Sequence, residues 1–430
     1  MGASVDVEAS NHAPALTECH DCGLLLRPRA LPEGGRAKCP RCGAGLYRRS
    51  RRNIDHVIAL NLAGLVLFSI ACLFPFMTFK LEGRVQTSTL ITGVIEFWDQ
   101  GLWPLATLVL SVTIVVPLAK MLATLGVLIP VRFGLPVRGL GPLFRAVELM
   151  HPWAMMEVFM LGVLVAYVKL TDLATLELGR ALFAFCLLIF VLAAAEASLE
   201  PRNVWAIIGN QGLRRLPKRR AENHIVGCHS CGLVFDLSGM SGGHADCPRC
   251  GARLHHRKPN SLNRTWALVI TAFVLYIPAN VFPVMTVISF GHGEPDTILS
   301  GVKALIAANM WPLALLVFFA SITVPMLKLC GLVFLLVSVH RKSTWRLRDR
   351  TVLYRIIESV GRWSMIDIFM ISILIALVKL QAIATIEPGI GATSFAGVVI
   401  ITMIASMMFD PRLMWDAAES KGELSEPASA

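Results

Sequence analysis

The sequence predicts an all-α polytopic membrane protein with two tandem bundles of four spanning helices, each preceded by a small cysteine-rich module. Three observations lead to this fold class: the composition, the number of long apolar segments and an internal repeat. Of the 430 residues, 55% are hydrophobic and only 16% are charged, whereas about a quarter of the residues in a soluble domain are charged. An ordinary soluble enzyme and a disordered chain are therefore both excluded.

Eight segments are long and apolar enough to cross a membrane, which requires about 20 residues of helix. Charges are sparse within them, and four segments lie in each half of the chain. In chain order they are Val57–Phe79, Gly101–Val131, Trp153–Leu170, Ala181–Leu199, Thr265–Gly291, Met310–Val339, Trp363–Leu380 and Pro388–Phe409.

The basic residues predict how these spans are oriented. The net charge is +11, and arginines gather before the first span, between the second and third, and between the sixth and seventh. Because cytoplasmic loops carry the excess of Lys and Arg, we expect both termini and the central linker to be cytoplasmic. The first 50 residues are polar and lack the apolar core of a cleavable signal peptide.

The two halves repeat each other at an offset of about 208 to 210 residues. Trp103-Pro104-Leu105 recurs as Trp311-Pro312-Leu313, and Pro75-Phe76-Met77-Thr78 as Pro283-Val284-Met285-Thr286. Each unit has an even number of spans, so both insert the same way up and form a parallel repeat. The predicted boundaries are 15–50 and 224–258 for the cysteine modules, 53–205 and 262–415 for the bundles, and 206–223 for a basic linker.

Eight of the eleven cysteines form two sets of paired Cys-x-x-Cys motifs, a spacing that favours metal over disulfides and a reducing compartment. Each pair is followed by a glycine, which permits the positive φ of a metal knuckle. We expect two closed zinc ribbons with one Zn²⁺ each, iron in a rubredoxin-like site being the alternative. The ligands are Cys19, Cys22, Cys39 and Cys42 in the first ribbon, and Cys228, Cys231, Cys247 and Cys250 in the second.

A structural role for the metal is favoured over catalysis, because no ligand position is left open. The basic linker could bind DNA, but anionic lipid headgroups explain its charge equally well beside a membrane. We therefore expect no nucleic acid partner.

Ionisable residues inside the spans are costly and usually functional. At 1.5 Å per residue, Lys328 and Asp367 fall at similar depth in the inner third of the membrane and could pair. Lys120 and Glu157 are the equivalent residues of the first half. Lys169 and Lys379 fall near the outer face, where a lysine can instead extend its ammonium into the headgroups.

The second half carries more hydroxyl groups around its acid and base. Each one alone is weak evidence, because such hydroxyls often bond only their own helix, but their clustering favours a working polar site in the second bundle. The predicted transport network is Ser321, Lys328, Ser364, Asp367, Ser372, Lys379 and Thr402; at four of these positions the first half has Thr113, Ala154, Gly162 and Leu192.

Other features limit the function further. The outer loops Thr87–Asp99 and Asp296–Asn309 carry apolar residues at helical spacing, which fits short interfacial helices, a lid or a docking surface. No nucleotide-binding loop and no catalytic constellation is visible, so we expect no enzyme.

The doubled ribbon-plus-bundle layout, with its Pro-Phe-Met-Thr, Trp-Pro-Leu and Pro-x-x-Lys elements, resembles the paraquat-inducible protein A family over about residues 15–415. Length and arrangement look most like its LetA (YebS) branch. The resemblance implies tetraspanin-like bundles in the inner membrane of a Gram-negative cell. It also implies a periplasmic MCE-domain partner that forms a tunnel, which the bundles load with phospholipid or unload. By analogy, we expect the polar site of the second bundle to couple proton or headgroup movement to lipid passage.

Two other functions remain open from the sequence. One is an anchor that holds the tunnel without moving lipid, and the other is a cytoplasmic metal or redox sensor that acts through the ribbons.

Overall fold

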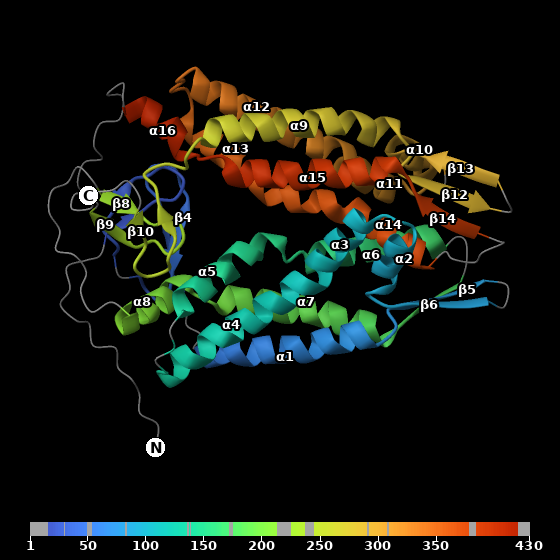
Figure 1. Ribbon diagram of the computed structural model, residues 1–430, viewed down its shortest axis with the longest axis horizontal. Helices are drawn as coiled ribbons and strands as arrows, with labels where there is room; N and C mark the ends of the chain where they lie inside the picture. Colours follow the sequence, from blue (N-terminus) through green and yellow to red (C-terminus); the bar gives the residue numbers. More distant parts are fainter. Residues whose placement is uncertain are drawn as a thin grey trace.

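The computed structural model describes residues 16–29, 31–49, 54–81, 84–135, 137, 139–171, 175–212, 225–236, 245–289, 292–307, 309–377 and 384–419. Two helical bundles lie side by side along the long axis, with small two-stranded sheets at one end and larger sheets at the other (Figure 1). We call these the ribbon end and the sheet end. Within the described residues, eight helical segments are long and apolar enough to cross a membrane, which confirms the predicted fold class.

The first half alternates long helices with short elements at the sheet end. Its elements are α1 (Ile54–Leu73), β5 (Met77–Leu81), β6 (Arg84–Ser88), α2 (Thr92–Asp99), α3 (Trp103–Leu110), α4 (Val116–Phe133), α5 (Leu140–Met150), α6 (Met156–Thr171), β7 (Thr175–Leu178), α7 (Arg180–Ser198) and α8 (Pro201–Gly212).

The second half repeats this order. Its elements are α9 (Ser261–Val281), β12 (Met285–Ser289), β13 (His292–Asp296), α10 (Ile298–Ala307), α11 (Trp311–Phe318), α12 (Val324–His340), α13 (Leu347–Val360), α14 (Ile366–Leu377), β14 (Ala384–Pro388), α15 (Ile390–Met408) and α16 (Arg412–Glu419).

Short strands form the ribbons. The first ribbon contains β1 (Thr17–Glu18), β2 (Leu25–Leu26), β3 (Arg36–Lys38) and β4 (Gly45–Arg48). The second contains β8 (Ile225–Gly227), β9 (Val234–Asp236), β10 (Ala245–Asp246) and β11 (Arg253–Leu254). Residues 213–223 of the predicted basic linker lie outside the described residues, whereas α8 extends seven positions past residue 205, the predicted end of the first bundle.

The second span of each half is widened by a π-helical turn, Ser111–Val115 and Phe319–Thr323. Each turn contains the residue four positions before a proline, Thr113 before Pro117 and Ser321 before Pro325. Proline has no N–H to donate, and its ring collides with the carbonyl of that residue. The helix relaxes this clash by widening, and such bulges are frequent at functional sites.

An antiparallel three-stranded sheet closes the sheet end of each bundle, in the orders β6-β5-β7 and β13-β12-β14. The sequence prediction missed these strands, because it extended the first span to Phe79 and the fifth to Gly291. Helices α1 and α9 instead end at Leu73 and Val281, two residues before Pro75 and Pro283, and the residue before a proline is disfavoured in helical conformation.

The third span of each half starts earlier than predicted. It begins at Leu140 and at Leu347, and short 3₁₀ segments, His151–Trp153 and Gly361–Met365, separate its two helices. The charges of α13 made this segment resemble a loop in the sequence.

Helix α14 lies between the two bundles, and all twelve of its residues are buried. Gly162 of α6 permits close approach, because a Cβ there would lie 2.8 Å from the Cβ of Phe369. On another side, a Cβ on Gly93 of α2 would meet the Ser372 hydroxyl at 2.3 Å and its carbonyl oxygen at 2.6 Å. The second bundle thus inserts α14 against two helices of the first.

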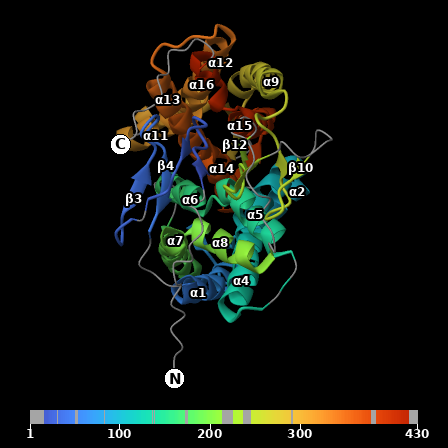
Figure 2. The same cartoon turned by 90° about the vertical axis from the view of Figure 1, so that its left-hand side faces the viewer.

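The ribbons are crossed. The first ribbon precedes the first bundle in sequence, but its cysteines belong to a buried apolar cluster with Leu332, Phe409 and Trp415 of the second bundle. The second ribbon's cysteines cluster instead with Phe144 and Trp205 of the first half. Figure 2, viewed from the ribbon end, shows the small strands of both ribbons in front of the helices of the two halves.

Candidate functional site

Each ribbon gathers four cysteine sulfurs into a compact buried cluster. Within each set the sulfur atoms all lie within 4.8 Å of one another. Cys19–Cys42 and Cys22–Cys39 are separated by 3.6 Å, and a tetrahedral zinc with Zn–S bonds of about 2.3 Å sets sulfurs ~3.8 Å apart. In the second ribbon the corresponding pairs, Cys228–Cys250 and Cys231–Cys247, are 3.5 Å apart. Both clusters could hold a metal ion.

The knuckle backbones adopt the predicted conformation. Gly23, Gly43, Gly232 and Gly251 have φ between 67° and 73°, a region that glycine enters without penalty. In each knuckle the glycine N–H donates to the carbonyl of the first cysteine, as Gly23 does to Cys19 at 2.9 Å.

The electrostatics of the clusters suit a cation. Hydrogen bonds from the other three thiols, above all from Cys19, hold the pKa of the Cys39 thiol well below its usual range. In the second ribbon, hydrogen bonds from the other three thiols, above all from Cys228, lower the pKa of Cys247 in the same way. The same hydrogen bonds, above all those with Cys19 and Cys228, raise the pKa of the Cys22 and Cys231 thiols well above that of a free thiol. A divalent cation resolves the competition by binding all four sulfurs as thiolates.

Arginine contacts join the first ribbon to the second bundle. Arg355 on α13 donates through Nη2 to the Cys42 carbonyl at 2.5 Å and pairs through Nε with Asp21 at 3.0 Å. Arg41 in turn lies over the ring of Trp415 on α16, 4.8 Å from its centroid. Since Asp21 is almost fully buried, the ion pair compensates a charge that water cannot reach.

The first bundle holds the second ribbon by the equivalent residue. Arg145 on α5, which aligns with Arg355, donates to the Gly251 carbonyl at 3.2 Å. Gly141 approaches the ribbon so closely that a Cβ there would meet the Arg249 carbonyl oxygen at 2.1 Å. The two dockings are therefore pseudo-equivalent, each made by the bundle that does not follow its ribbon.

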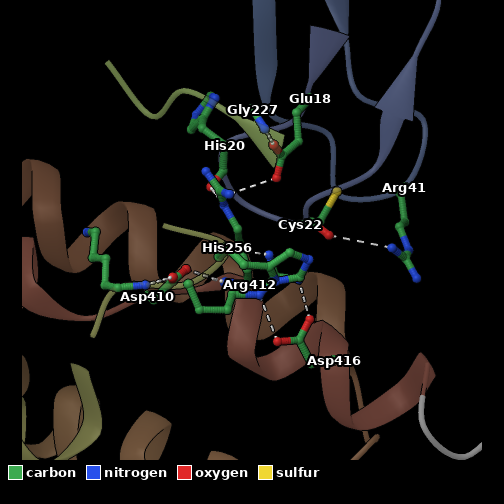
Figure 3. Close-up of polar contacts among 11 residues, drawn as sticks. Glu18, His20, Cys22, Arg41, Gly227, His256, Asp410, Arg412 and Asp416 are labelled. Atoms are coloured by element: carbon green, nitrogen blue, oxygen red, sulfur yellow. Dashed lines mark hydrogen bonds and ion pairs between the residues drawn. The ribbon is translucent and has the colours of Figure 1, made fainter. Parts of the chain in front are cut away.

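Glu18 joins the two ribbons and α16 (Figure 3). Its Oε2 accepts a hydrogen bond from the Gly227 N–H at 2.7 Å, and its Oε1 accepts one from Arg412 Nη1 at 2.7 Å. Arg412 also donates to the His20 carbonyl at 3.2 Å. Nearby, Arg257 forms a two-pronged ion pair with Asp416, and that hydrogen bonding raises the arginine's pKa. The sequence prediction did not identify this junction, because its residues are hundreds of positions apart.

In the second bundle, Lys328 and Asp367 are both buried, each 4% exposed. The Lys328 ammonium lies against Gly361, where a Cβ would be 2.5 Å from its Nζ. Asp367 lines a small, partly open cavity with Met285, Asp296 and Thr297 near the sheet end.

The sequence allowed an ion pair between Lys328 and Asp367, but the described residues contain no such pair. The Lys328 ammonium lies against Gly361, and Asp367 follows Gly361 by six residues, about 9 Å farther toward the sheet end along the span. The prediction placed Asp367 too near the ribbon end, because it began the span at Trp363 instead of Leu347.

The predicted hydroxyl groups are buried but divide into two kinds. Ser321 donates to the Val317 carbonyl at 2.7 Å and Thr402 to the Val399 carbonyl at 3.0 Å, so both bond their own helix. Ser364 has no hydrogen-bond partner in the part of the chain that the structure describes, and Ser372 lies against Gly93. Lys379 lies outside the described residues.

The first bundle contains a larger, partly open cavity near the ribbon end. Lys120 and Glu157 line it together with Glu196 and Asn61. Lys120 is paired with Glu196 and lies 3.1 Å from His151 Nδ1. The predicted polar site did not include Glu196, which lies inside the predicted fourth span, or His151, which lies two residues before the predicted third span. Lys169 lies in α6, and the structure describes its backbone but not its side chain.

These observations define a class: a polytopic membrane protein of two tandem halves, each with four candidate spans and a four-cysteine module. The chain belongs to the paraquat-inducible protein A family, whose model matches residues 54–209 and 262–419. The predicted family is confirmed.

Relatives match over nearly the whole length. The chain is 35% identical to Intermembrane transport protein PqiA of Escherichia coli, over 94% of this chain and 97% of that protein. It is 31% identical to Lipophilic envelope-spanning tunnel protein A of the same organism, over 94% and 91%. It is 28% identical to a Probable intermembrane transport protein of Haemophilus influenzae, over 93% and 95%. The chain thus matches both PqiA and the tunnel protein, and its identity to PqiA is the higher of the two. No solved structure matches the chain.

Proposed function

We propose that this chain is the inner-membrane subunit of an envelope lipid-transport system. It passes phospholipids to, or takes them from, a periplasmic MCE-domain partner that forms a tunnel. The relatives' names, an intermembrane transport protein and an envelope-spanning tunnel protein, support transport across the envelope. The ribbon end then faces the cytoplasm, as the loop charges predict, and the sheet end faces the partner.

The observation that carries this proposal is the position of Asp367. It lies on a helix enclosed on every side by protein, and its carboxyl group lines a cavity at the sheet end beside Asp296. A carboxylate at this depth is costly and is retained where it serves a pathway or a relay. An anchor that moved nothing would have no use for it.

Polar side chains lie on both sides of Asp367 along its span: Lys328, against Gly361, and Ser364 on one side, and Ser372 on the other. In this proposal Lys328 and Asp367 interact with the transported lipid or proton one after the other, at different depths in the membrane, and do not form one ion pair. The hydroxyls of Ser321 and Thr402 contribute less, because they are already bonded within their helices.

The test is reconstitution in liposomes with the MCE-domain partner, following a labelled phospholipid with and without a pH gradient. Asp367→Asn and Lys328→Ala should each reduce transfer at least tenfold while thermal stability in detergent is retained. The matched controls are Asp99→Asn and Lys303→Ala, which change exposed side chains at the sheet end and should leave transfer unchanged. Background transfer by the unaltered protein in both conditions would favour a passive anchor instead.

A further inference from the structure

The cavity of the first bundle brings three charged residues to one depth. Lys120 is 17 residues along its span from Trp103, Glu196 is 16 residues from Arg180, and Glu157 is 14 residues from Thr171. At 1.5 Å per residue these positions lie ~21 to 25 Å from the sheet end. In a hydrocarbon core of about 30 Å, this is the depth just beneath the headgroups at the ribbon end.

The charges of this cavity are unequally compensated. Lys120 is paired with Glu196, and His151 approaches both, at 3.1 Å from the Lys120 Nζ and 3.5 Å from the Glu196 carboxylate. Glu157 also lines the cavity and has an exposed side chain, and it has no hydrogen-bond or ion-pair partner among the described residues. One carboxylate within a membrane span is thus left without a cation from the protein, which is costly unless a ligand supplies one.

Lys120 retains capacity for a second interaction. Its ammonium has three N–H donors, of which Glu196 takes one and His151 Nδ1 can take another. Asn61 and Thr124 also line the cavity, but each donates to a carbonyl of its own helix. The other walls are apolar and include Val57, Met121 and Leu192. A ligand that fits must therefore combine a cationic group, an anionic group and an apolar tail.

We propose that this cavity binds the headgroup of an amine-bearing phospholipid. The lipid's ammonium pairs with Glu157, its phosphate accepts from Lys120, and its acyl chain lies along the apolar wall. This inference deepens the proposed transport function and rests on it for the role of the bound lipid, but the binding itself can be measured separately.

The second half does not repeat this site. Leu332, fully buried, aligns with Thr124 of the cavity wall, while Gly361 and Ser406 align with His151 and Glu196. Lys328 extends over Gly361 into the place that a histidine side chain would need. The proposal therefore assigns lipid selection to the first bundle and leaves Asp367 of the second to transport.

The test uses the full chain in nanodiscs that contain trace photoreactive phosphatidylethanolamine or phosphatidylglycerol, with a diazirine on the acyl chain. After illumination, mass spectrometry should find ethanolamine-lipid adducts on α1, α4 and α7 of the first bundle. Glu157→Gln should reduce these adducts about tenfold, the range expected for one charge-assisted contact, and should abolish the preference over phosphatidylglycerol. Glu157→Asp should keep the preference.

Two matched variants complete the design. Glu177→Gln makes the same change on β7 at the opposite end and should leave labelling intact. Ala154→Phe fills the cavity and should reduce labelling by both lipids. Equal labelling by the two lipids in the unaltered protein, or undiminished ethanolamine-lipid labelling of a folded Glu157→Gln protein, would overturn the proposal. Either result would leave the transport assay with Asp367→Asn untouched, so the two proposals fail separately.

Discussion

Phe159 and Phe369 occupy equivalent positions of the two halves, and their rings meet edge to face with centroids 5.4 Å apart and planes at 69°. They lie on α6 and α14, the pair of helices that joins the bundles. Lipid tails are as apolar as these rings, so the contact is stabilised by packing geometry and not by exclusion of water. The duplication axis of the protein thus passes through an aromatic pair, which fixes how the bundles meet.

Truncating either ring should loosen the association of the bundles. Phe159→Ala and Phe369→Ala each remove a buried aromatic, a change that typically costs about 3–5 kcal/mol in a protein core. The thermal midpoint in detergent should fall clearly for both. Phe190→Ala, on an exposed face of α7, is the control, and an equal fall there would contradict the assignment.

The contact of Gly93 with Ser372 offers a test with an internal control. Gly93→Ala forces a methyl group into the Ser372 backbone, and overpacking of this kind costs about 1–3 kcal/mol. Gly301 is the equivalent glycine of the second half, and a Cβ there meets nothing within 4 Å. Gly301→Ala should therefore be neutral or stabilising in the same thermal assay. Equal effects of the two variants would show that α14 does not lie against α2.

The crossed docking predicts which ribbon responds to which arginine. Arg355→Ala removes the ion pair with Asp21 and the hydrogen bond to Cys42, at a cost of about 1–3 kcal/mol. Hydrogen exchange should then quicken in the first ribbon, whereas Arg145→Ala should quicken it in the second. Arg346→Ala, at an exposed surface pair, should change neither. The opposite assignment of ribbons to arginines would refute the crossing.

Metal analysis tests the two cysteine clusters. The purified chain should contain two zinc ions, and Cys22→Ser or Cys231→Ser should each reduce the content to about one. Cys330→Ser, an exposed cysteine outside both clusters, should keep two. Removing both ions with a chelator should unfold the ribbons, because modules of this size depend on the metal for their stability. Iron instead of zinc would identify a rubredoxin-like site.

Local patterns were enough to predict the spans and the cysteine knuckles. Apolar length and the glycine after each Cys-x-x-Cys act over a few residues, so the number of spans and the positive φ values agree with the described part of the structure. The strand pairs at the sheet end could not be found in this way, because Thr78 pairs with Glu177 across almost a hundred residues.

The position of Asp367 shows where periodicity misleads. Helix α13 carries Arg350 and Arg355, which look like loop residues in a hydropathy profile. In the structure these arginines face Ser338 of α12 and the first ribbon, respectively. Their charge is compensated by tertiary contacts, so the helix continues where the sequence predicted its absence, and the depth of Asp367 changes with it.

The crossed ribbons also bear on how such a chain arises and how it can be divided. If each half once existed as a separate polypeptide, the same contacts would make a symmetric pair of subunits that exchange their amino-terminal modules, a common and inexpensive route to a dimer. Fusion would preserve that exchange inside one molecule. Each half then relies on the other for the apolar packing around its ribbon's cysteines, so two fragments divided between residues 212 and 225 should be soluble in detergent only when they are produced together.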